Sequence, residues 1–391
     1  MSTFRRATLL ALALVASTSP GLDAQPRIRN YALKAQPQQR WMLAAQPTVS
    51  IGGADSGAQE LSMVASTFRM PGGSVVVAVM RQAELRLFDS RGRYLQSLGR
   101  KGRGPGEFPV LWSAFALRDS LLGIDAAGIG QLFGPDGKFV RTIPRTSAFG
   151  RRLEVAGYFG DGATFGYFYP DPLERAPSGE SVIDAMLVRV SPSRTDSLRR
   201  VAAGSVNRRG GGEPTAVAYA ARLQLAVFGD RFCESSSSDY VVRCYLADGK
   251  SHVEIRRPDA RTAAITQGDR DRFFAGIDKA NPDPRAAGYR REIRERTEFA
   301  RVRPQIGRLV AGATGELWVG SYDPAESVDG TLHPSPDSAT TWQVYSATGD
   351  WLAQLRLPAR FRLFDAGRDW ILGVRRDEDD VEYVELYQLT R

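Results

Sequence analysis

A repeated hairpin constrains this chain more than any other feature of its sequence. Each copy reads as a strand of alternating apolar and polar residues, a four-residue turn and a second alternating strand. The copies lie at 85–99, 130–144, 240–256, 341–358 and, in degenerate form, 186–202. Four of the turns contain a glycine, which supplies the positive φ angle that a tight hairpin needs. These glycines are Gly92, Gly137, Gly249 and Gly349. The repeat predicts an array of small antiparallel sheets.

A second hairpin lies upstream of each copy and completes a four-stranded unit. It covers 68–80, 116–128, 158–170 and 309–323, and 225–234 holds the same place before the copy at 240–256. Gly92 and Gly137 are 45 residues apart, which is the period of a propeller blade. A radial array of blades protects the edges of its sheets, but its two ends must be joined.

The C-terminal segment predicts how the array closes. Residues 361–391 contain only three strand patterns, and 40–52 contains one that could serve as the fourth. The expected fold is all-β: a six-bladed β-propeller of four-stranded antiparallel blades, in which an N-terminal strand completes the last blade. The expected blades are 55–99, 108–144, 152–202, 217–258, 305–358, and 360–391 with 40–52.

One segment interrupts the strand patterns between the fourth and fifth blades. Residues 261–301 place apolar residues three and four apart among charges, which predicts two amphipathic helices separated by the NPDP sequence at 281–284. Charged runs on helices are usually solvated. We therefore expect a helical insertion with a polar surface rather than a ligand site.

The inter-blade segment Gly99–Phe108, with the sequence GRKGRGPGEF, resembles the joint of NHL-like repeats. With the repeat itself, it makes the chain similar to exported bacterial six-bladed propellers of the NHL-like (TolB-like) kind. Only one joint matches, because the others have diverged. The resemblance implies the fold and leaves the activity open, since such propellers serve as binding platforms, lyases and lactone hydrolases.

The N-terminus and the two cysteines indicate an exported protein. Residues 1–24 combine Arg5 and Arg6, a ten-residue apolar run and a small polar end at Ala24, which is the pattern of a signal peptide. Residues 25–39 would then be an N-terminal extension and 40–391 the propeller. No later segment is long enough to cross a membrane, so a periplasmic or secreted location is expected. In an oxidising compartment, Cys233 and Cys244 on facing strands of one hairpin should form a disulfide.

The lengths of the connections predict where a ligand would bind. In a propeller, the turns between the second and third strands of each blade and the links between blades share one face, which we call the loop-rich face. The long connections all belong to it: 99–108, 169–180, 203–215, 258–304 and 322–339. Long loops on a rigid scaffold commonly carry binding sites. The candidate binding residues on this face are Arg100, Lys101, Arg103, Glu107, Arg208 and Arg209.

Two glycine-rich segments of this face could bind an anion. A phosphate loop needs a strand before it and a helix after it, and a strand follows Gly99–Phe108, so we interpret that segment as a structural joint. The RRGGG sequence at 208–212 is interpreted as a flexible loop. The inner strands should line the channel, and their polar candidates are Ser62, Thr67, Ser113, Glu154, Tyr158 and Arg222.

Metal chemistry finds little support in the sequence. With only His252 and His333, the histidine cluster of the amidating lyases cannot be assembled. The acidic run 377–380 lacks the ligand spacing and glycine of a calcium loop, and is expected to keep a turn in water. No metal site and no cofactor is predicted, although a channel Ca²⁺ would accompany an enzymatic alternative.

Two functions remain open. The first is a non-catalytic binding or scaffold protein that uses the loop-rich face to bind a protein, peptide or glycan. The alternative is an exported hydrolase or lyase whose channel carboxylates hold a divalent cation. The net charge of +8 does not indicate nucleic acid, because the arginines are spread along the chain and no nucleic-acid motif is present. A monomer is expected.

Overall fold

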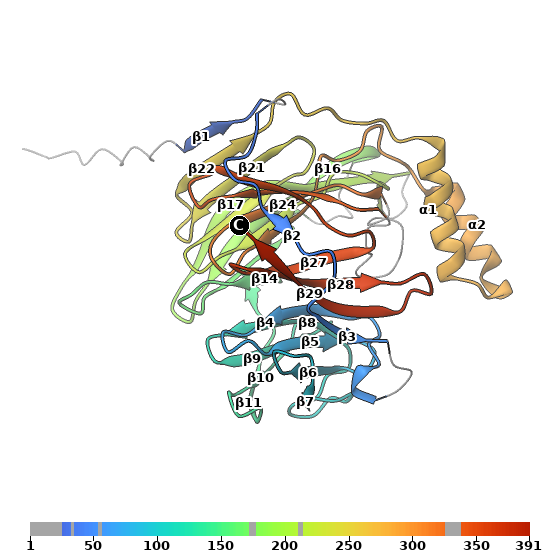
Figure 1. The fold of residues 1–391 in the computed structure, drawn as a ribbon. Helices are drawn as coiled ribbons and strands as arrows, with labels where there is room; N and C mark the ends of the chain where they lie inside the picture. Colours follow the sequence, from blue (N-terminus) through green and yellow to red (C-terminus); the bar gives the residue numbers. More distant parts are fainter. Residues whose placement is uncertain (1–25, 33–34, 54–56, 172–176, 210–213, 325–337) are drawn as a thin grey trace, which may run out of the picture.

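The chain folds as a six-bladed β-propeller (Figure 1). In this computed structural model, the described residues are 26–32, 35–53, 57–171, 177–209, 214–324 and 338–391. The predicted signal peptide, 1–24, and His333 lie outside them. In each blade the consecutive strands pair antiparallel and follow the chain outward from the channel, so the sequence-based prediction of the fold is confirmed.

Three blades have four strands each, which the sequence repeat predicted. The first consists of β4 (Val64–Arg69), β5 (Val75–Val79), β6 (Glu84–Phe88) and β7 (Tyr94–Leu98). The second consists of β8 (Leu111–Leu117), β9 (Ser120–Asp125), β10 (Gly130–Phe133) and β11 (Phe139–Ile143). The fifth consists of β23 (Ile306–Ala311), β24 (Leu317–Ser321), β25 (Thr341–Tyr345) and β26 (Trp351–Arg356). A short 3-10 helix, η1 (Gly57–Gln59), precedes the first blade.

The third blade is larger than its sequence predicted. It consists of β14 (Glu154–Tyr158), β15 (Thr164–Phe168), β16 (Gly179–Val190), β17 (Thr195–Arg208) and β18 (Thr215–Ala216), and a small hairpin, β12 (Ser147–Ala148) with β13 (Arg151–Arg152), precedes it. β15 pairs only with Met186–Val190 of β16, so the rest of the β16–β17 hairpin extends past its neighbour. The expected loops 169–180 and 203–215 are therefore partly strand.

The sixth blade closes the ring as predicted. Its strands β27 (Phe361–Ala366), β28 (Trp370–Arg376) and β29 (Glu382–Thr390) come from the C-terminus. β3 (Val49–Gly52) and β2 (Met42–Leu43) from the N-terminal region both pair antiparallel with β29. Val384 lies opposite Ile51 in this register, and both side chains are buried. Burial of apolar residues from both ends of the chain thus stabilises the closed ring.

The fourth blade receives a strand that sequence analysis did not predict. Its own strands are β19 (Gln224–Val227), β20 (Arg231–Ser235), β21 (Val241–Leu246) and β22 (Ser251–Arg256). β1 (Arg27–Asn30) adds to its outer edge, parallel to β22. The Tyr31 hydroxyl then donates to the carbonyl of Gly349 and accepts from the N–H of Trp351 in the fifth blade. Residues between 26 and 52 therefore run along the outer edges of three blades.

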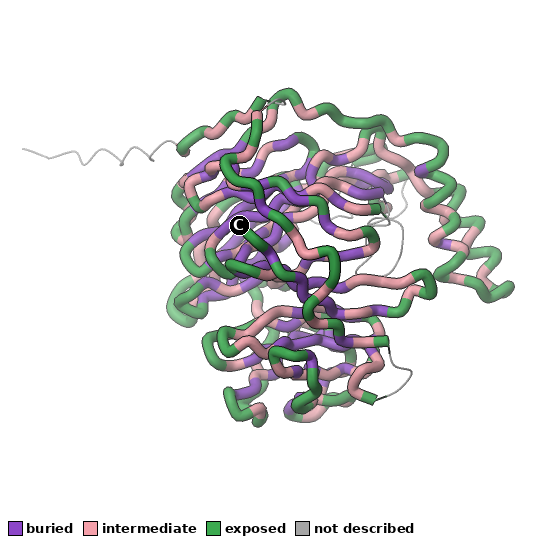
Figure 2. Tube along the Cα trace, in the orientation of Figure 1, coloured by how far each residue is buried: buried purple, intermediate pink, exposed green. Residues whose placement is uncertain are grey.

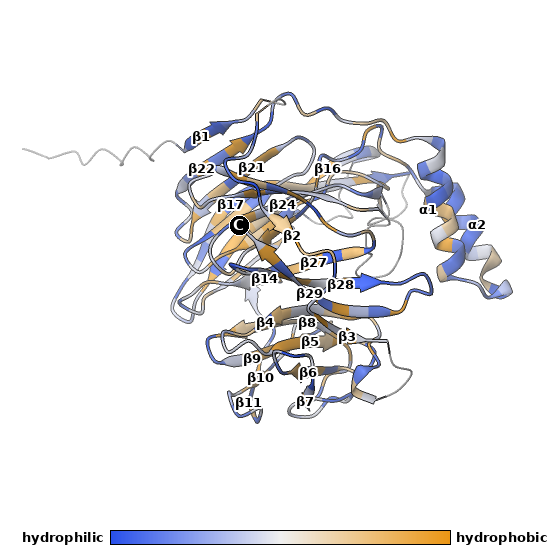
Figure 3. Cartoon of the chain, viewed as in Figure 1, coloured by the Kyte–Doolittle hydropathy of each residue, from blue (hydrophilic) through white to orange (hydrophobic). Residues whose placement is uncertain are grey.

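The core lies between neighbouring blades rather than within one of them. Buried residues follow the strands, whereas the residues of the helices are mostly exposed or intermediate (Figure 2). Between the fifth and sixth blades, for example, Trp318 and Trp342 belong to the same apolar cluster as Phe361. Residues in the strands are correspondingly more hydrophobic, and residues in the helices are more hydrophilic (Figure 3).

The disulfide prediction is confirmed. Cys233 on β20 lies directly opposite Cys244 on β21, and the two are bonded. Both are buried within the fourth blade. No other cysteine occurs in the sequence, so this bond engages both cysteines of the chain.

Candidate functional site

The helical insertion stands on the loop-rich face, in the link between the fourth and fifth blades. It consists of α1 (Gln267–Ala280), η3 (Pro284–Ala286) and α2 (Ala287–Arg296), which lie together at one side of the propeller (Figure 1). The predicted location of the two helices is confirmed. The chain enters and leaves the insertion through an antiparallel pair, in which Ala264 bridges to Val302. We call this pair the neck.

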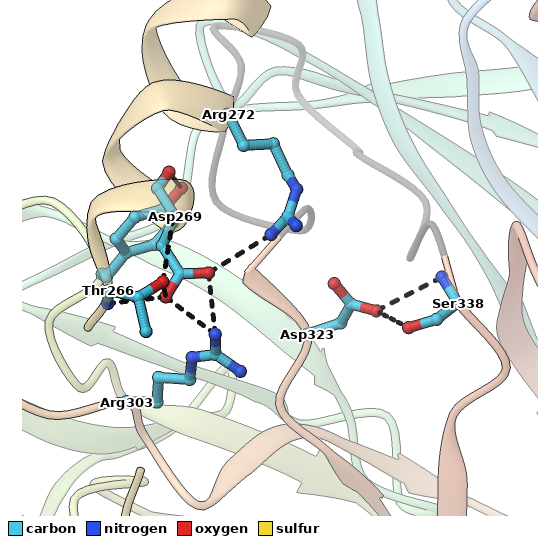
Figure 4. Close-up of polar contacts among 7 residues, drawn as sticks. Thr266, Asp269, Arg272, Arg303, Asp323 and Ser338 are labelled. Carbon is cyan, nitrogen blue, oxygen red and sulfur yellow. Dashed lines mark hydrogen bonds and ion pairs between the residues drawn. The ribbon is translucent and has the colours of Figure 1, made fainter. Parts of the chain in front are cut away.

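A buried carboxylate anchors the first helix to the neck (Figure 4). Asp269 is only 1% exposed and receives Arg303 Nη2 at 2.7 Å on both of its oxygens. The N–H and hydroxyl of Thr266 also donate to it, and Arg272 lies 3.2 Å away. Burial by itself would raise the pKa of Asp269, but the hydrogen bonds from Arg303 and Thr266 outweigh it and lower this pKa to about 2.

Aromatic residues attach the same helix to the link between the third and fourth blades. Tyr219 is fully buried in that link and contacts the rings of Phe273 and Phe299. Its hydroxyl donates to the backbone carbonyl of Asp269 at 2.8 Å. Tyr219 has a φ of 59°, an unusual conformation for a residue with a side chain. The packing around it must therefore outweigh that strain.

The insertion also reaches the sixth blade. Lys279 near the end of α1 forms an ion pair with Asp380, which pairs with Arg360 as well. Asp380 belongs to the acidic run 377–380, between β28 and β29. Asp377 in the same run accepts from the N–H groups of Asp379 and Val381, and so closes the turn itself. The run thus organises a turn and contacts α1.

The glycine-rich joint Gly99–Phe108 satisfies its own polar groups. Glu107 accepts from Arg100 Nε at 2.7 Å and from the Gly104 N–H at 2.9 Å, and these hydrogen bonds lower its pKa. A Cβ atom on Gly102 would lie 2.0 Å from Glu107 Oε2, and one on Gly99 would lie 2.5 Å from the buried ring of Phe108. These contacts agree with the interpretation as a structural joint.

The structure separates the six candidate residues of the loop-rich face. Arg100 and Glu107 bind each other, while Lys101 and Arg103 are exposed in the same joint. Arg208 ends β17, opposite Gly179, and is therefore in a strand rather than in the expected flexible loop. Arg209 bonds to Glu298 and to the Glu295 carbonyl, and so connects the third blade to the insertion.

The channel candidates are dispersed as well. Glu154 forms an ion pair with Arg152 at 3.4 Å at the start of β14. Tyr158 lies at the other end of that strand, its ring against Phe115, and burial raises its pKa to about 12.

Ser113 is half-buried on β8, as is Ser62 just before β4. Thr67 is buried and donates to the Val76 carbonyl of its own blade. Arg222 lies next to a cleft beside the third blade.

A group of inner-strand residues in the last two blades was not predicted from the sequence. Arg308 on β23 and Arg362 on β27 both stack on the ring of Phe364, at 4.9 and 4.6 Å. Phe364 occupies a β-bulge, a feature that redirects a side chain. The next residue, Asp365, accepts from the N–H groups of Arg69 and Ala366. Burial raises the pKa of Asp365 to about 6. Period-two patterns cannot reveal such bulges, because a bulge breaks the period.

Exposed apolar side chains gather on the loop-rich face. They occur at strand starts, in links and in turns of this face: Met63, Val110, Trp112, Ile129, Phe149, Val182, Val302 and Val381. The other large exposed apolar residues of the described chain lie on the outer strands β1, β2, β7 and β11, on α2 of the insertion, and at Leu246, the last residue of β21.

The described residues lack two further features. Within the described ranges, no group of three or more His, Cys, Asp or Glu residues could hold a metal ion. No helix among the same residues is long and apolar enough to span a bilayer.

Comparisons with known proteins give structural neighbours only. No family model and no curated protein sequence matches the chain. A candidate exported protein of Bacteroides fragilis is 12% identical, with a TM-score of 0.48 over 93% of this chain and 99% of the neighbour. A member of the DUF4221 family from Bacteroides vulgatus is 9% identical, with a TM-score of 0.48 over 90% and 99%. A streptogramin B lyase is 8% identical, with a TM-score of 0.40 over 91% and 99%.

Proposed function

We propose that this chain is an exported, non-catalytic binding protein of the NHL-like propeller type, and that its loop-rich face binds a partner protein or peptide. The observation that carries the proposal is the gathering of exposed apolar residues on that face. Trp112 is 40% exposed and Phe149 is 60% exposed, although both are large enough to belong to a core. Large apolar side chains that stay exposed on one face commonly mark an interaction site.

The polar groups of the same face support binding rather than catalysis. The carboxylates Asp269, Glu107 and Asp380 are all engaged by arginine, lysine or backbone N–H groups. A general acid or base must instead reach a substrate directly. Apolar residues interspersed with arginines are typical of protein interfaces, where aromatic residues and Arg supply most of the binding energy.

The test uses peptides selected from a random displayed library on the purified mature chain. We expect the selected peptides to lose at least about tenfold in affinity for the W112S/F149S variant, because truncating a central aromatic contact commonly costs more than 1 kcal/mol. The matched control is L95S/V140S, whose two positions are each 55% exposed on outer strands and should bind as the wild type does. Equal losses in both variants would contradict the proposal.

The alternative, a hydrolase or lyase with a channel cation, has its own test. Metal analysis of the purified chain and its thermal stability with and without EDTA are measured together. One stoichiometric divalent ion, with a lower melting temperature in EDTA, would favour the enzyme over the binding protein.

A further inference from the structure

A cleft of about 330 Å³ opens on the loop-rich face beside the third blade. One side is the part of the β16–β17 hairpin that extends past β15, and the other is the link that leads into β19. The larger residues that line it are Tyr167, Tyr169, Ile183, Val206, Leu223 and the exposed Arg222. Small residues such as Gly204 leave the space open. The cleft is not a feature of a regular four-stranded blade, because the extension of the hairpin forms one of its sides.

The apolar part of the cleft suits a ring. Tyr167 and Tyr169 are half-buried and meet edge to face, with ring centroids 5.8 Å apart. Burial raises the pKa of Tyr167, so its hydroxyl stays neutral. Aromatic pairs of this geometry accept a further ring edge-on or offset. Ile183 and Leu223 provide aliphatic surface in the same cleft.

The charged part of the cleft is Arg222. Its backbone is held from both sides by Ser237, whose Oγ accepts from the Arg222 N–H at 2.9 Å and donates to the Arg222 carbonyl at 2.8 Å. Its guanidinium makes no hydrogen bond or ion pair with any residue that the structure describes. A clamped backbone with a free guanidinium presents a fork of donors that matches a carboxylate.

We propose that this cleft binds a small carboxylate with an apolar, ring-shaped body, the carboxylate against Arg222 and the body against the two tyrosines. The proposal deepens the proposed function, on which it rests, by naming the chemistry that one pocket of the loop-rich face selects. The volume lies at the lower end of the range for small-molecule sites, so it admits a single ring and excludes a folded domain. The ligand is either a free aryl carboxylate or the C-terminal residue of a peptide.

The experiment compares two probes with their uncharged amides by isothermal titration calorimetry. The probes are 3-phenylpropionate and a tetrapeptide that ends in phenylalanine with a free carboxylate. We expect at least one carboxylate to bind, and its amide to bind at least about tenfold more weakly, because hydrogen bonds to a charged group are stronger than those to a neutral group. A peptide that binds tenfold more tightly than 3-phenylpropionate identifies a chain terminus as the source; otherwise the source is a free carboxylate.

Two variants make the result specific to the cleft. R222M removes the charge but keeps a long side chain. We expect it to lower the affinity for the carboxylate about tenfold and to leave the affinity for the amide unchanged. The control is R91M, which alters an exposed arginine in a turn of the opposite face and should bind as the wild type does. No binding of either carboxylate at 10 mM (about the weakest useful affinity), or equal binding by R222M, would overturn the proposal. The library peptides, compared between the wild type and the W112S/F149S variant, test the proposed function independently.

Discussion

The neck of the helical insertion and the junction between the sixth and first blades each contain a key aspartate. The surroundings of these two aspartates shift their pKa values in opposite directions. The pKa of Asp269 in the neck falls to about 2, whereas that of Asp365 at the junction rises to about 6. Burial raises the pKa of both. The difference is that Asp269 receives hydrogen bonds from two arginines and Thr266, while Asp365 accepts from two backbone N–H groups.

This comparison shows that burial alone does not decide the charge state of a carboxylate. Charged donors and a hydroxyl offset the loss of water around Asp269, and two neutral donors do not offset it for Asp365. The neck should therefore tolerate acid, whereas the blade junction should be more stable in mild acid than at neutral pH. The predictions below test this contrast, in order of decreasing expected effect.

The largest effect is expected for Asp269→Ala. The substitution leaves Arg303 and Arg272 without their shared carboxylate, and breaking a buried pair costs about 3 kcal/mol. We expect faster hydrogen exchange throughout α1, with the blades unchanged. Asp271→Ala is the matched control, because Asp271 is exposed on the same helix. Unchanged exchange in α1 of the Asp269 variant would show that the neck does not depend on this ion pair.

The second effect concerns pH. The pKa of Asp365 is raised in the folded chain, so its stabilising contribution is complete below about pH 4 and is lost as the pH rises through 6. The free energy of unfolding by urea should decrease over this window by up to about 3 kcal/mol. Asp365→Asn should flatten the profile. Asp269 adds no slope there, because its contribution is lost only as the pH falls from about 4 to 2. An equally steep profile in the Asn variant would assign the slope to other groups.

A smaller effect is expected for Tyr219→Phe. The change removes one buried hydrogen bond to the Asp269 carbonyl but keeps the ring contacts with Phe273 and Phe299. A hydrogen bond of this kind contributes about 1 kcal/mol. Hydrogen exchange of α1 should therefore accelerate about fivefold. An effect as large as that of Asp269→Ala would mean that the hydroxyl, rather than the carboxylate, holds the helix.

The smallest effect is expected for Lys279→Ala. Its ion pair with Asp380 connects the insertion to the sixth blade, but the Lys279 side chain is 74% exposed. Exposed pairs typically contribute only a few tenths of a kcal/mol and are screened by salt. Protection of α1 should change by less than about twofold and become insensitive to salt. A large loss would show that the sixth blade holds the insertion in place.

Much of the blade architecture could be predicted because it depends on local sequence patterns. The turn glycine Gly92, for instance, has a φ of 79°, and the pairing of Cys233 with Cys244 follows from the hairpin that encloses them. The β16–β17 hairpin was predicted only as a degenerate copy at 186–202, and its extension beyond these residues was not predicted, because its register shifts twice, between Ile183 and Asp184 and between Leu187 and Val188. Each shift breaks the alternation on which a strand prediction depends.

The candidate site was less predictable than the fold. Arg209 was assigned to the loop-rich face from the sequence, but its partner Glu298 is 89 residues away, so the ion pair could not be predicted. The cleft beside the third blade likewise joins a hairpin extension to a link, and neither part has a signature of its own. Arg222 was assigned to the channel, and only the structure shows that it lines this cleft.

The sequence by itself determined the number of blades, the closing strand, the insertion and the disulfide, because period-two alternation, turn glycines and helical spacing act over a few residues. The tertiary structure decided which charges meet, which aspartate is held ionised and where a cleft opens. Those outcomes depend on contacts between segments far apart in the chain, such as Arg69 with Asp365, and no local pattern records them.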